Sequence, residues 1–250
     1  MHPLTLTRKE MANLLLSLQS TEGVSPIDII KDAVIALPNR SNTENETATA
    51  RMDSSLPAIF EKVMRISKRN VGLSINEIVA LGNQIEYSSF SASAVQNWVK
   101  RDVRGLIGSP QKGKKYSLEQ AAILFIVEDL KSTLDFVSIR NLLTLIFNNI
   151  EDRHDDLIDP LHYYITYSSI FEELDVNRDN VVDVDFRIHH GDQAEVLIFQ
   201  KAEEKVKSIE HLDEKEKSII QNALVISTLS VQTSYFQSIS RQFLNSTILI

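Results

Sequence analysis

The chain has 250 residues with only 7 Gly and 6 Pro, and this scarcity of turn residues predicts long helices rather than a many-stranded sandwich or barrel. The absence of cysteine excludes disulfide bonds, thiolate zinc sites and thiol nucleophiles, and it is typical of a protein from a reducing cytoplasm. The net charge of −8 disfavours nucleic acid as a partner for the chain as a whole.

The first 56 residues are predicted to form an N-terminal helical segment that ends in a polar loop. Residues 5–20 carry a leucine-rich face, which indicates a first helix. The pair Ser25-Pro26 is typical of a second helix start, and Pro38 is expected to end that helix. Residues 39–55 are rich in Ser, Thr, Asn and Glu, so we expect an exposed loop there.

Short helices follow one another in the next part of the chain. Pro57 is expected to open a helix that runs to about Lys68. A helix over 73–81 has Ser74 and, three residues on, Glu77, the spacing of a capping box. After a connection from Gly82 to Phe90, a helix begins at Ser91 or Ser93, and Trp98 is expected on its buried face.

The remaining chain is predicted to be mainly helical. Ser117 and Gln120 form a second capping box, and the apolar run over 121–127 indicates a central, buried helix. Residues 151–250 are expected to form a C-terminal region for dimerisation or effector sensing. The helices expected after Thr133 include one that ends at Asn148-Asn149 and others over 161–174, 193–209 and 215–242, with a strand-capable polar segment before 193.

The positive charge of this acidic chain is concentrated in one window. Between Trp98 and Lys115 there are six cations and a single anion, Asp102, so the window carries +5 and the rest of the chain −13. Five of the seven glycines lie in or just before the same window, at 72, 82, 105, 108 and 113. A basic surface supplies the sequence-independent part of nucleic-acid affinity through phosphate contacts.

Two short helices followed by a basic, glycine-containing hairpin over Gly105–Lys115 is the order of a winged helix-turn-helix. In such a fold the second helix, here Ser93–Arg104, reads base edges in the major groove, and the hairpin, or wing, contacts phosphates. Tyr116 either packs at the base of the wing or donates its hydroxyl to a phosphate. The predicted DNA-binding residues are Ser93, Gln96, Asn97, Lys100, Arg101, Arg104, Lys112, Lys114, Lys115 and Tyr116.

The stretch SASAVQNWVKRDVRGLIGSPQKGKKYSLEQAAILFIVEDLKSTLDFVSIRNLL resembles the MerR-type winged helix, with Tyr116-Ser117 and Leu142-Leu143 at matching places. It is also similar to a family of uncharacterised proteins from low-GC Gram-positive bacteria, known as a domain of unknown function. In that family phrases like SAVQNWVKRD, KKYS, DD-LID and LHYY recur in this order, and the similarity covers about 57–170. The resemblance implies a DNA-binding fold and a regulatory role, with no biochemical activity attached.

The chain departs from the MerR pattern in two places. The connection GNQIEYSSF is about five residues longer than a tight helix-turn-helix turn. The wing is short, and no arginine directly precedes Tyr116. Both departures affect how the helix that carries Gln96 and Asn97 is aimed.

Two weaker patterns suggest metal chemistry. Residues 175–186, DVNRDNVVDVDF, have acidic or amide residues at positions one, three, five and nine of a calcium loop, but Asn180 replaces its glycine and Phe186 its final glutamate. An acidic turn is therefore the preferred interpretation. The pair His154-Asp155 is similar to the His-Asp pair of metal-dependent phosphohydrolases, although His162, His189 and His190 lack diagnostic spacing.

The sequence favours a cytoplasmic, DNA-binding transcriptional regulator, with a winged helix-turn-helix over 57–150 in a mainly α protein. We expect a homodimer on double-stranded DNA, with an unidentified small-molecule effector, and neither enzymatic activity nor a cofactor. No nucleotide-binding loop, zinc-protease motif, signal peptide or membrane-spanning stretch is found in the sequence. The alternative functions are a helical module whose basic wing binds an acidic protein, and a His-Asp phosphohydrolase.

Overall fold

The computed structural model describes residues 4–19, 23–40, 56–65, 71–148, 155–184 and 193–248. These residues are mainly helical, and their β-pairing is confined to three isolated bridges. None of the helices in these ranges combines the length and the apolar character that crossing a membrane needs. The helices are α1 (Arg8–Gln19), α2 (Pro26–Arg40), α4 (Ala58–Met64), α5 (Ile75–Gly82), α6 (Ala92–Asn97), α7 (Arg104–Ile107), α8 (Leu118–Leu130), α9 (Phe136–Phe147), α10 (Pro160–Leu174), α11 (Ala194–Lys207) and α12 (Glu214–Ile248).

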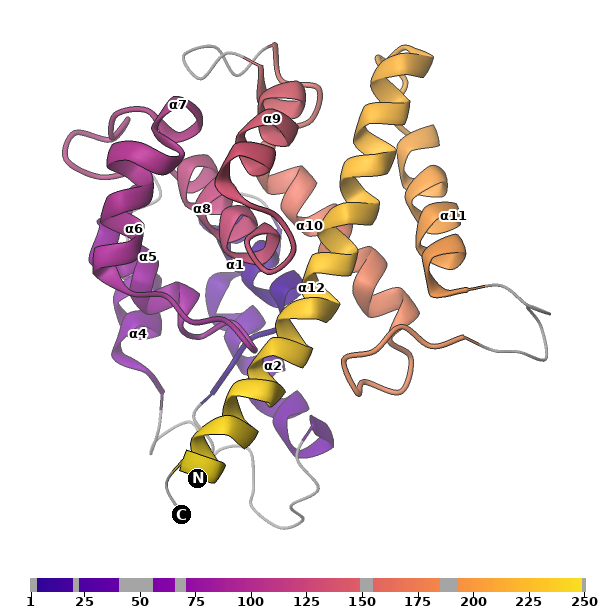
Figure 1. The fold of residues 1–250 in the computed structure, drawn as a ribbon. Coiled ribbons are helices and arrows are strands. Elements are labelled where there is room, and N and C mark those ends of the chain that lie inside the picture. Colours follow the sequence, from indigo (N-terminus) through magenta and orange to yellow (C-terminus); the bar gives the residue numbers. More distant parts are fainter. Residues whose placement is uncertain are drawn as a thin grey trace.

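Helix α8 is the centre of the molecule, as its all-round apolar sequence predicts. Both hydrogen bonds of its capping box are present, since Ser117 Oγ accepts from the backbone of Gln120 and Gln120 Oε1 accepts from the backbone of Ser117. Every residue over 120–130 is buried. Helices α1, α10 and α12 pack around α8 and leave α5, α6 and α7 along one side of the molecule (Figure 1).

A buried ionic network joins three helices at this centre. The Arg8 Nε of α1 lies 2.8 Å from Asp129 Oδ1 of α8, and the Tyr167 hydroxyl of α10 donates to Asp129 Oδ2 over 2.7 Å. Arg8 and Asp129 are 7% and 2% exposed. Loss of either partner would leave an uncompensated charge in the core, so a buried charge pair of this kind is costly to break.

The C-terminal helices lie where the sequence predicts them. Helix α10 begins at its Asp159 cap, which accepts hydrogen bonds from Leu161 and His162, and α11 and α12 follow after the acidic turn. Helix α12 has 35 residues and extends to Ile248, beyond the expected end at 242. It runs along the whole molecule (Figure 1), and all residues over 240–248 are exposed.

Two local predictions are wrong. Helix α2 continues to Arg40, so Pro38 does not end it. Pro38 lies in the last turn of α2, and only Asn39 and Arg40 follow it in the helix. The strand-capable segment forms no strand over 175–184, because its carboxylates bind backbone amides within the turn. The rest of that segment and the predicted loop after Arg40 lie outside the described residues.

The three predicted segments share one hydrophobic core, to which each contributes buried residues. The N-terminal chain also pairs directly with the connection between α5 and α6. The Leu6 backbone donates to Gln84 O over 2.6 Å and accepts from Glu86 N over 3.0 Å. The connection is therefore held by the N-terminal segment as well as by its own two helices.

Candidate nucleic-acid interface

Helix α5 starts at the predicted capping box, and Glu77 of that box also binds two lysines. Ser74 N donates to Glu77 Oε2 over 2.7 Å, while Lys62 Nζ and Lys115 Nζ lie 2.8 and 3.4 Å from its carboxylate. Burial alone would raise the pKa of Glu77, but the hydrogen bonds of Lys62 and Ser74 and the charge of Lys115 lower it to about 2. Glu77 thus joins α4, α5 and the wing.

The connection after α5 is closed by one side chain at its two ends. Asn83 Nδ2 donates to Phe90 O over 3.0 Å, and Phe90 N donates to Asn83 Oδ1 over 2.8 Å. A Cβ on Gly82 would lie 2.5 Å from the Phe90 ring, so only glycine permits this approach. The long connection is therefore compact where it enters and leaves the helices.

The predicted reading helix, Ser93–Arg104, is not one continuous α-helix. Ser91, not Ser93, is the cap of α6, and it accepts a hydrogen bond from Ala94 N. After Asn97 the chain forms a π-helical turn over Trp98–Asp102, in which Val103 N donates to Trp98 O five residues back. Helix α7 then follows.

The π turn has a simple cause in the side chains. The wider turn brings Val103, which is 0% exposed, to the core face that Trp98 occupies at 5% exposure. Without the extra residue, an α-helical spacing would turn Asp102 toward that face. Trp98 packs against Phe90 and Phe136, which agrees with its predicted core role.

The predicted wing is smaller than the expected Gly105–Lys115 hairpin. Gly105 belongs to α7, and the hairpin is confined to Lys112–Lys115, where each lysine donates its backbone N–H to the other's carbonyl over 2.9 and 3.1 Å. Gly113 has φ 67°, a conformation that favours glycine in so tight a turn. The next residue, Tyr116, exchanges two backbone hydrogen bonds of 2.8 Å with Leu73, which precedes α5.

Gln120 holds the segment between α7 and the wing, a role that the sequence analysis missed. Its Nε2 donates to Ile107 O over 2.6 Å and to Ser109 O over 2.8 Å, and its Oε1 accepts from Gln111 N over 3.3 Å. The side chain is fully buried. A polar residue at a buried position of an apolar helix is the signal that could have pointed to it.

Nine of the ten predicted DNA-binding residues are exposed, and Tyr116 is not. Tyr116 is 8% exposed, which supports the packing interpretation over a phosphate contact, and burial raises the pKa of its hydroxyl. The exposed residues, which we call the basic face, come from α6, the π turn, α7 and the wing: Ser93, Gln96, Asn97, Lys100, Arg101, Arg104, Lys112, Lys114 and Lys115.

Most cations of the basic face are free of ion pairs with other described residues. Arg101 lies 4.0 Å from Asp102, a weak contact, and Lys115 is the one that pairs with Glu77. The four others in this part of the structure have no such partner: Lys100, Arg104, Lys112 and Lys114. Arg140 of α9, missed in the sequence, contacts the π turn, where it donates to Asp102 O over 2.6 Å.

The metal-like patterns form no comparable site. Asp175 accepts hydrogen bonds from the backbone of Asp179 and Asn180, and Asn177 binds Asp183, so the acidic turn is held by its own carboxylates. Among the described residues no group of three His, Cys, Asp or Glu is arranged to hold a metal ion. His154, His189 and His190 of the hydrolase hypothesis lie outside those residues.

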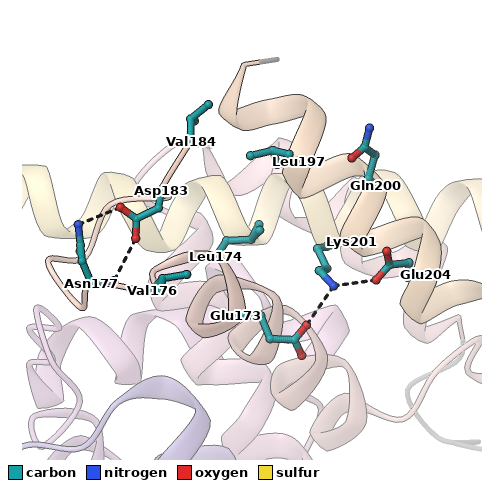
Figure 2. A pocket seen from close by; sticks show the side chains of 10 residues that line it. All are labelled: Glu173, Leu174, Val176, Asn177, Asp183, Val184, Leu197, Gln200, Lys201 and Glu204. Atoms are coloured by element: carbon teal, nitrogen blue, oxygen red, sulfur yellow. Dashed lines mark hydrogen bonds and ion pairs between the residues drawn. The ribbon is translucent and has the colours of Figure 1, made fainter. Parts of the chain in front are cut away.

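A cavity of about 570 Å³ lies between this turn, the end of α10 and α11. Figure 2 shows that its charged side chains contact one another or Asn177, whereas Gln200 contacts none of the residues drawn. Lys201 lies 2.8 Å from Glu204 and 3.7 Å from Glu173, and Asn177 Nδ2 donates to Asp183 over 2.8 Å. These mutual contacts leave few groups for a ligand.

The fold and the basic face define a mainly helical protein in which α6, the π turn, α7 and a small hairpin together present a cluster of exposed cations. Residues 58–167, which include the whole basic face, match the family described as "Domain of unknown function (DUF1836)". The "Uncharacterized protein YkrK" of Bacillus subtilis (strain 168) is 36% identical over 241 residues, 93% of this chain and 94% of that protein. The chain belongs to this family. No solved structure matches it.

Proposed function

We propose that this protein is a DNA-binding transcriptional regulator that uses a MerR-like winged helix-turn-helix. The observation that carries the proposal is the basic face, where unpaired lysines and arginines gather on one short part of an otherwise acidic chain. Cations without carboxylate partners are available for phosphates, and their binding releases counterions from DNA. The order of α5, α6 and a hairpin tied to Leu73 agrees with a winged helix.

The roles of the exposed residues follow from their chemistry. Gln96 and Asn97 at the end of α6 present amides that can pair with adenine edges in the major groove. Lys100, Arg101 and Arg104 are suited to guanine or phosphate, and Lys112 and Lys114 on the wing to phosphates. Lys115 differs from the other two wing lysines, because its ammonium group forms an ion pair with the Glu77 carboxylate. We therefore assign Lys115 to holding the wing in place.

A dimer accompanies this function. Regulators of this kind place two reading helices on half-sites about one helical turn apart. The end of α12 carries a row of exposed apolar residues, Phe236, Phe243, Leu244 and Ile248, which are 48%, 69%, 56% and 71% exposed. Large exposed apolar side chains of this kind are typical of an association surface. We assign this helix end to pairing with a second copy of the chain.

The test is the salt dependence of binding to a mixed-sequence duplex of about 30 base pairs. Five phosphate contacts predict a slope of log K against log salt of about −4 to −5. An absence of measurable binding at low salt would contradict the proposal. It would favour the alternative that the same cations bind an acidic protein.

A further inference from the structure

The carboxylate next to Asp129 in the sequence is also buried. Glu128 of α8 is 7% exposed. Its Oε1 lies 3.0 Å from Lys131 Nζ, and the backbone N–H of Ser89 approaches the same oxygen over 3.5 Å. The other oxygen, Oε2, is buried and has no hydrogen-bond partner in the described part of the chain. A buried carboxylate with one oxygen unsatisfied is costly in its ionised form.

The titratable and charged groups that face Glu128 come from three elements. They are Asp129 and Lys131 of its own helix, Tyr87 of the connection between α5 and α6, and Arg241 of α12. Tyr87 and Arg241 line a cavity of about 60 Å³ together with Glu128. Lys131 is the one cation among the described residues that forms an ion pair with Glu128. This ion pair is therefore the main contact that favours the ionised carboxylate.

Burial outweighs the ion pair. Burial raises the pKa of Glu128 to about 7, although the charge and the hydrogen bond of Lys131 lower it. The nearby charge of Asp129 acts in the same direction as burial. The Glu128 carboxyl group therefore gains or loses its charge near neutral pH, where an ordinary glutamate stays ionised.

Lys131 connects this carboxylate to the basic face. Its Nζ lies over the Trp98 ring, 5.5 Å from the ring centroid, which is the distance of a cation–π contact. Trp98 begins the π turn and packs against Phe90, where the connection ends. Ser89, whose N–H approaches Glu128, directly precedes Phe90. Both contacts of the Glu128 carboxylate therefore lead to the segment that positions α6.

We propose that Glu128, Lys131 and Trp98 form a proton-sensitive contact between the central helix α8 and the π turn of the basic face. When Glu128 is ionised, its carboxylate holds the Lys131 ammonium over the indole ring. Proton uptake removes that attraction, and the Lys131 side chain, already 32% exposed, turns toward solvent. The hydrogen bond from Ser89 also weakens, because a neutral carboxyl oxygen is a poorer acceptor than a carboxylate.

Carbon-13 NMR of the full chain, labelled at its glutamate carboxyl groups, measures the titration directly. The Glu128 signal is assigned by its absence from the spectrum of Glu128→Gln, and it is expected to titrate with a midpoint of about 7. Histidines titrate in the same pH range, but they carry no carboxyl signal. A midpoint near the ordinary value of 4.5 would overturn the proposal.

Fluorescence tests the contact with Trp98, which is the single tryptophan of the chain. Its emission is expected to change with pH around the same midpoint, because a charge leaves the face of the ring. Glu128→Gln and Lys131→Met are each expected to abolish this transition, whereas the control His162→Gln on α10 is expected to keep it. No transition in the natural protein, or one that persists in Glu128→Gln, would overturn the contact.

Proton binding at Glu128 also affects stability. Because folding raises its pKa from 4.5 to about 7, this contribution to stability is fully present below about pH 4.5 and is lost as pH rises through about 7. Glu128→Gln stays neutral at every pH. The Tm of the natural protein, measured relative to that of Glu128→Gln, is therefore expected to fall between about pH 5 and about pH 8. A difference in Tm that stays constant would contradict the buried titration.

DNA binding at two pH values tests the effect on the basic face and rests on the proposed function. The natural protein is expected to change its duplex affinity at least about threefold between about pH 6 and about pH 8. Glu128→Gln, which mimics the protonated form, is expected to show the low-pH affinity at both. Equal changes in the two proteins would refute the link to DNA. A protein that shows the Glu128 titration but binds no DNA would refute the proposed function and leave the proton-sensitive contact standing.

Discussion

The buried side-chain amide of Gln120 donates a hydrogen bond of 2.6 Å to the carbonyl oxygen of Ile107. With its second bond to Ser109 O, it fastens the chain between α7 and the wing onto the central helix. A residue in the first turn of α8 therefore also helps to fix where the wing leaves the core. Together with the backbone pair of Leu73 and Tyr116 and the ion pair of Glu77 and Lys115, this side chain positions the wing.

Replacing Gln120 with leucine is expected to lower the free energy of unfolding by about 1–3 kcal/mol, because two carbonyl groups and two N–H groups lose their side-chain partner. Urea unfolding measures the change. Gln111→Ala is the matched control, since the exposed Gln111 contributes its backbone and not its side chain to this network. Equal stability of Gln120→Leu and the natural protein would contradict this role.

Glu77 makes stability depend on acid pH. Its pKa is about 2 in the folded protein and about 4.5 in the unfolded chain, so its contribution is fully present above about pH 4.5 and is lost as pH falls toward 2. Glu77→Gln is expected to cost about 2 kcal/mol at pH 7 and little at pH 2. Unfolding free energies of both proteins across this range check it. A cost that does not change with pH would contradict the ion pairs.

Gly82 and Gly105 provide a matched pair of substitutions. Gly82→Ala places a methyl group 2.5 Å from the buried Phe90 ring and is expected to destabilise the protein by about 1–3 kcal/mol. Gly105→Ala meets no atom within 4 Å in α7 and is expected to be neutral or stabilising by up to about 1 kcal/mol. Thermal unfolding distinguishes them. The same effect at both positions would show that the close approach at Gly82 is unimportant.

Substitutions that introduce negative charge test the association surface at the end of α12. Phe243→Glu with Leu244→Glu is expected to convert a dimer into a monomer, because two carboxylates would be buried against the second copy. Sedimentation velocity measures the change. The substitution Ser246→Glu on the same exposed helix end, away from the apolar row, is expected to leave the dimer intact. A natural protein that is monomeric at all concentrations would refute this surface.

Local signals in the sequence predicted much of the fold. The capping boxes at Ser74 and Ser117, the all-round apolar α8, and the start of α10 are decided by neighbours within four residues, and all are present. The π turn depends on how Val103 meets a core formed by distant helices, so helical spacing alone did not reveal it.

The candidate sites show the same division between local and distant contacts. The exposed positions of the basic face before the wing followed from helical periodicity around Val95 and Trp98. The ion pair of Glu77 with Lys115 joins residues 38 positions apart, and the ring contact of Tyr87 with Tyr235 joins residues 148 positions apart. No sequence pattern marks either contact.

The most direct test of the account is retention of sheared genomic DNA by the purified protein, compared with two triple charge reversals. Lys100→Glu, Arg101→Glu and Arg104→Glu together are expected to reduce affinity at least about 100-fold, through loss of phosphate contacts and new repulsion. The control, Lys31→Glu, Lys207→Glu and Lys215→Glu, makes the same change in net charge at exposed positions elsewhere and is expected to retain most of the binding. Unchanged retention by the first variant, or equal loss in both, would contradict a DNA-binding role for the basic face.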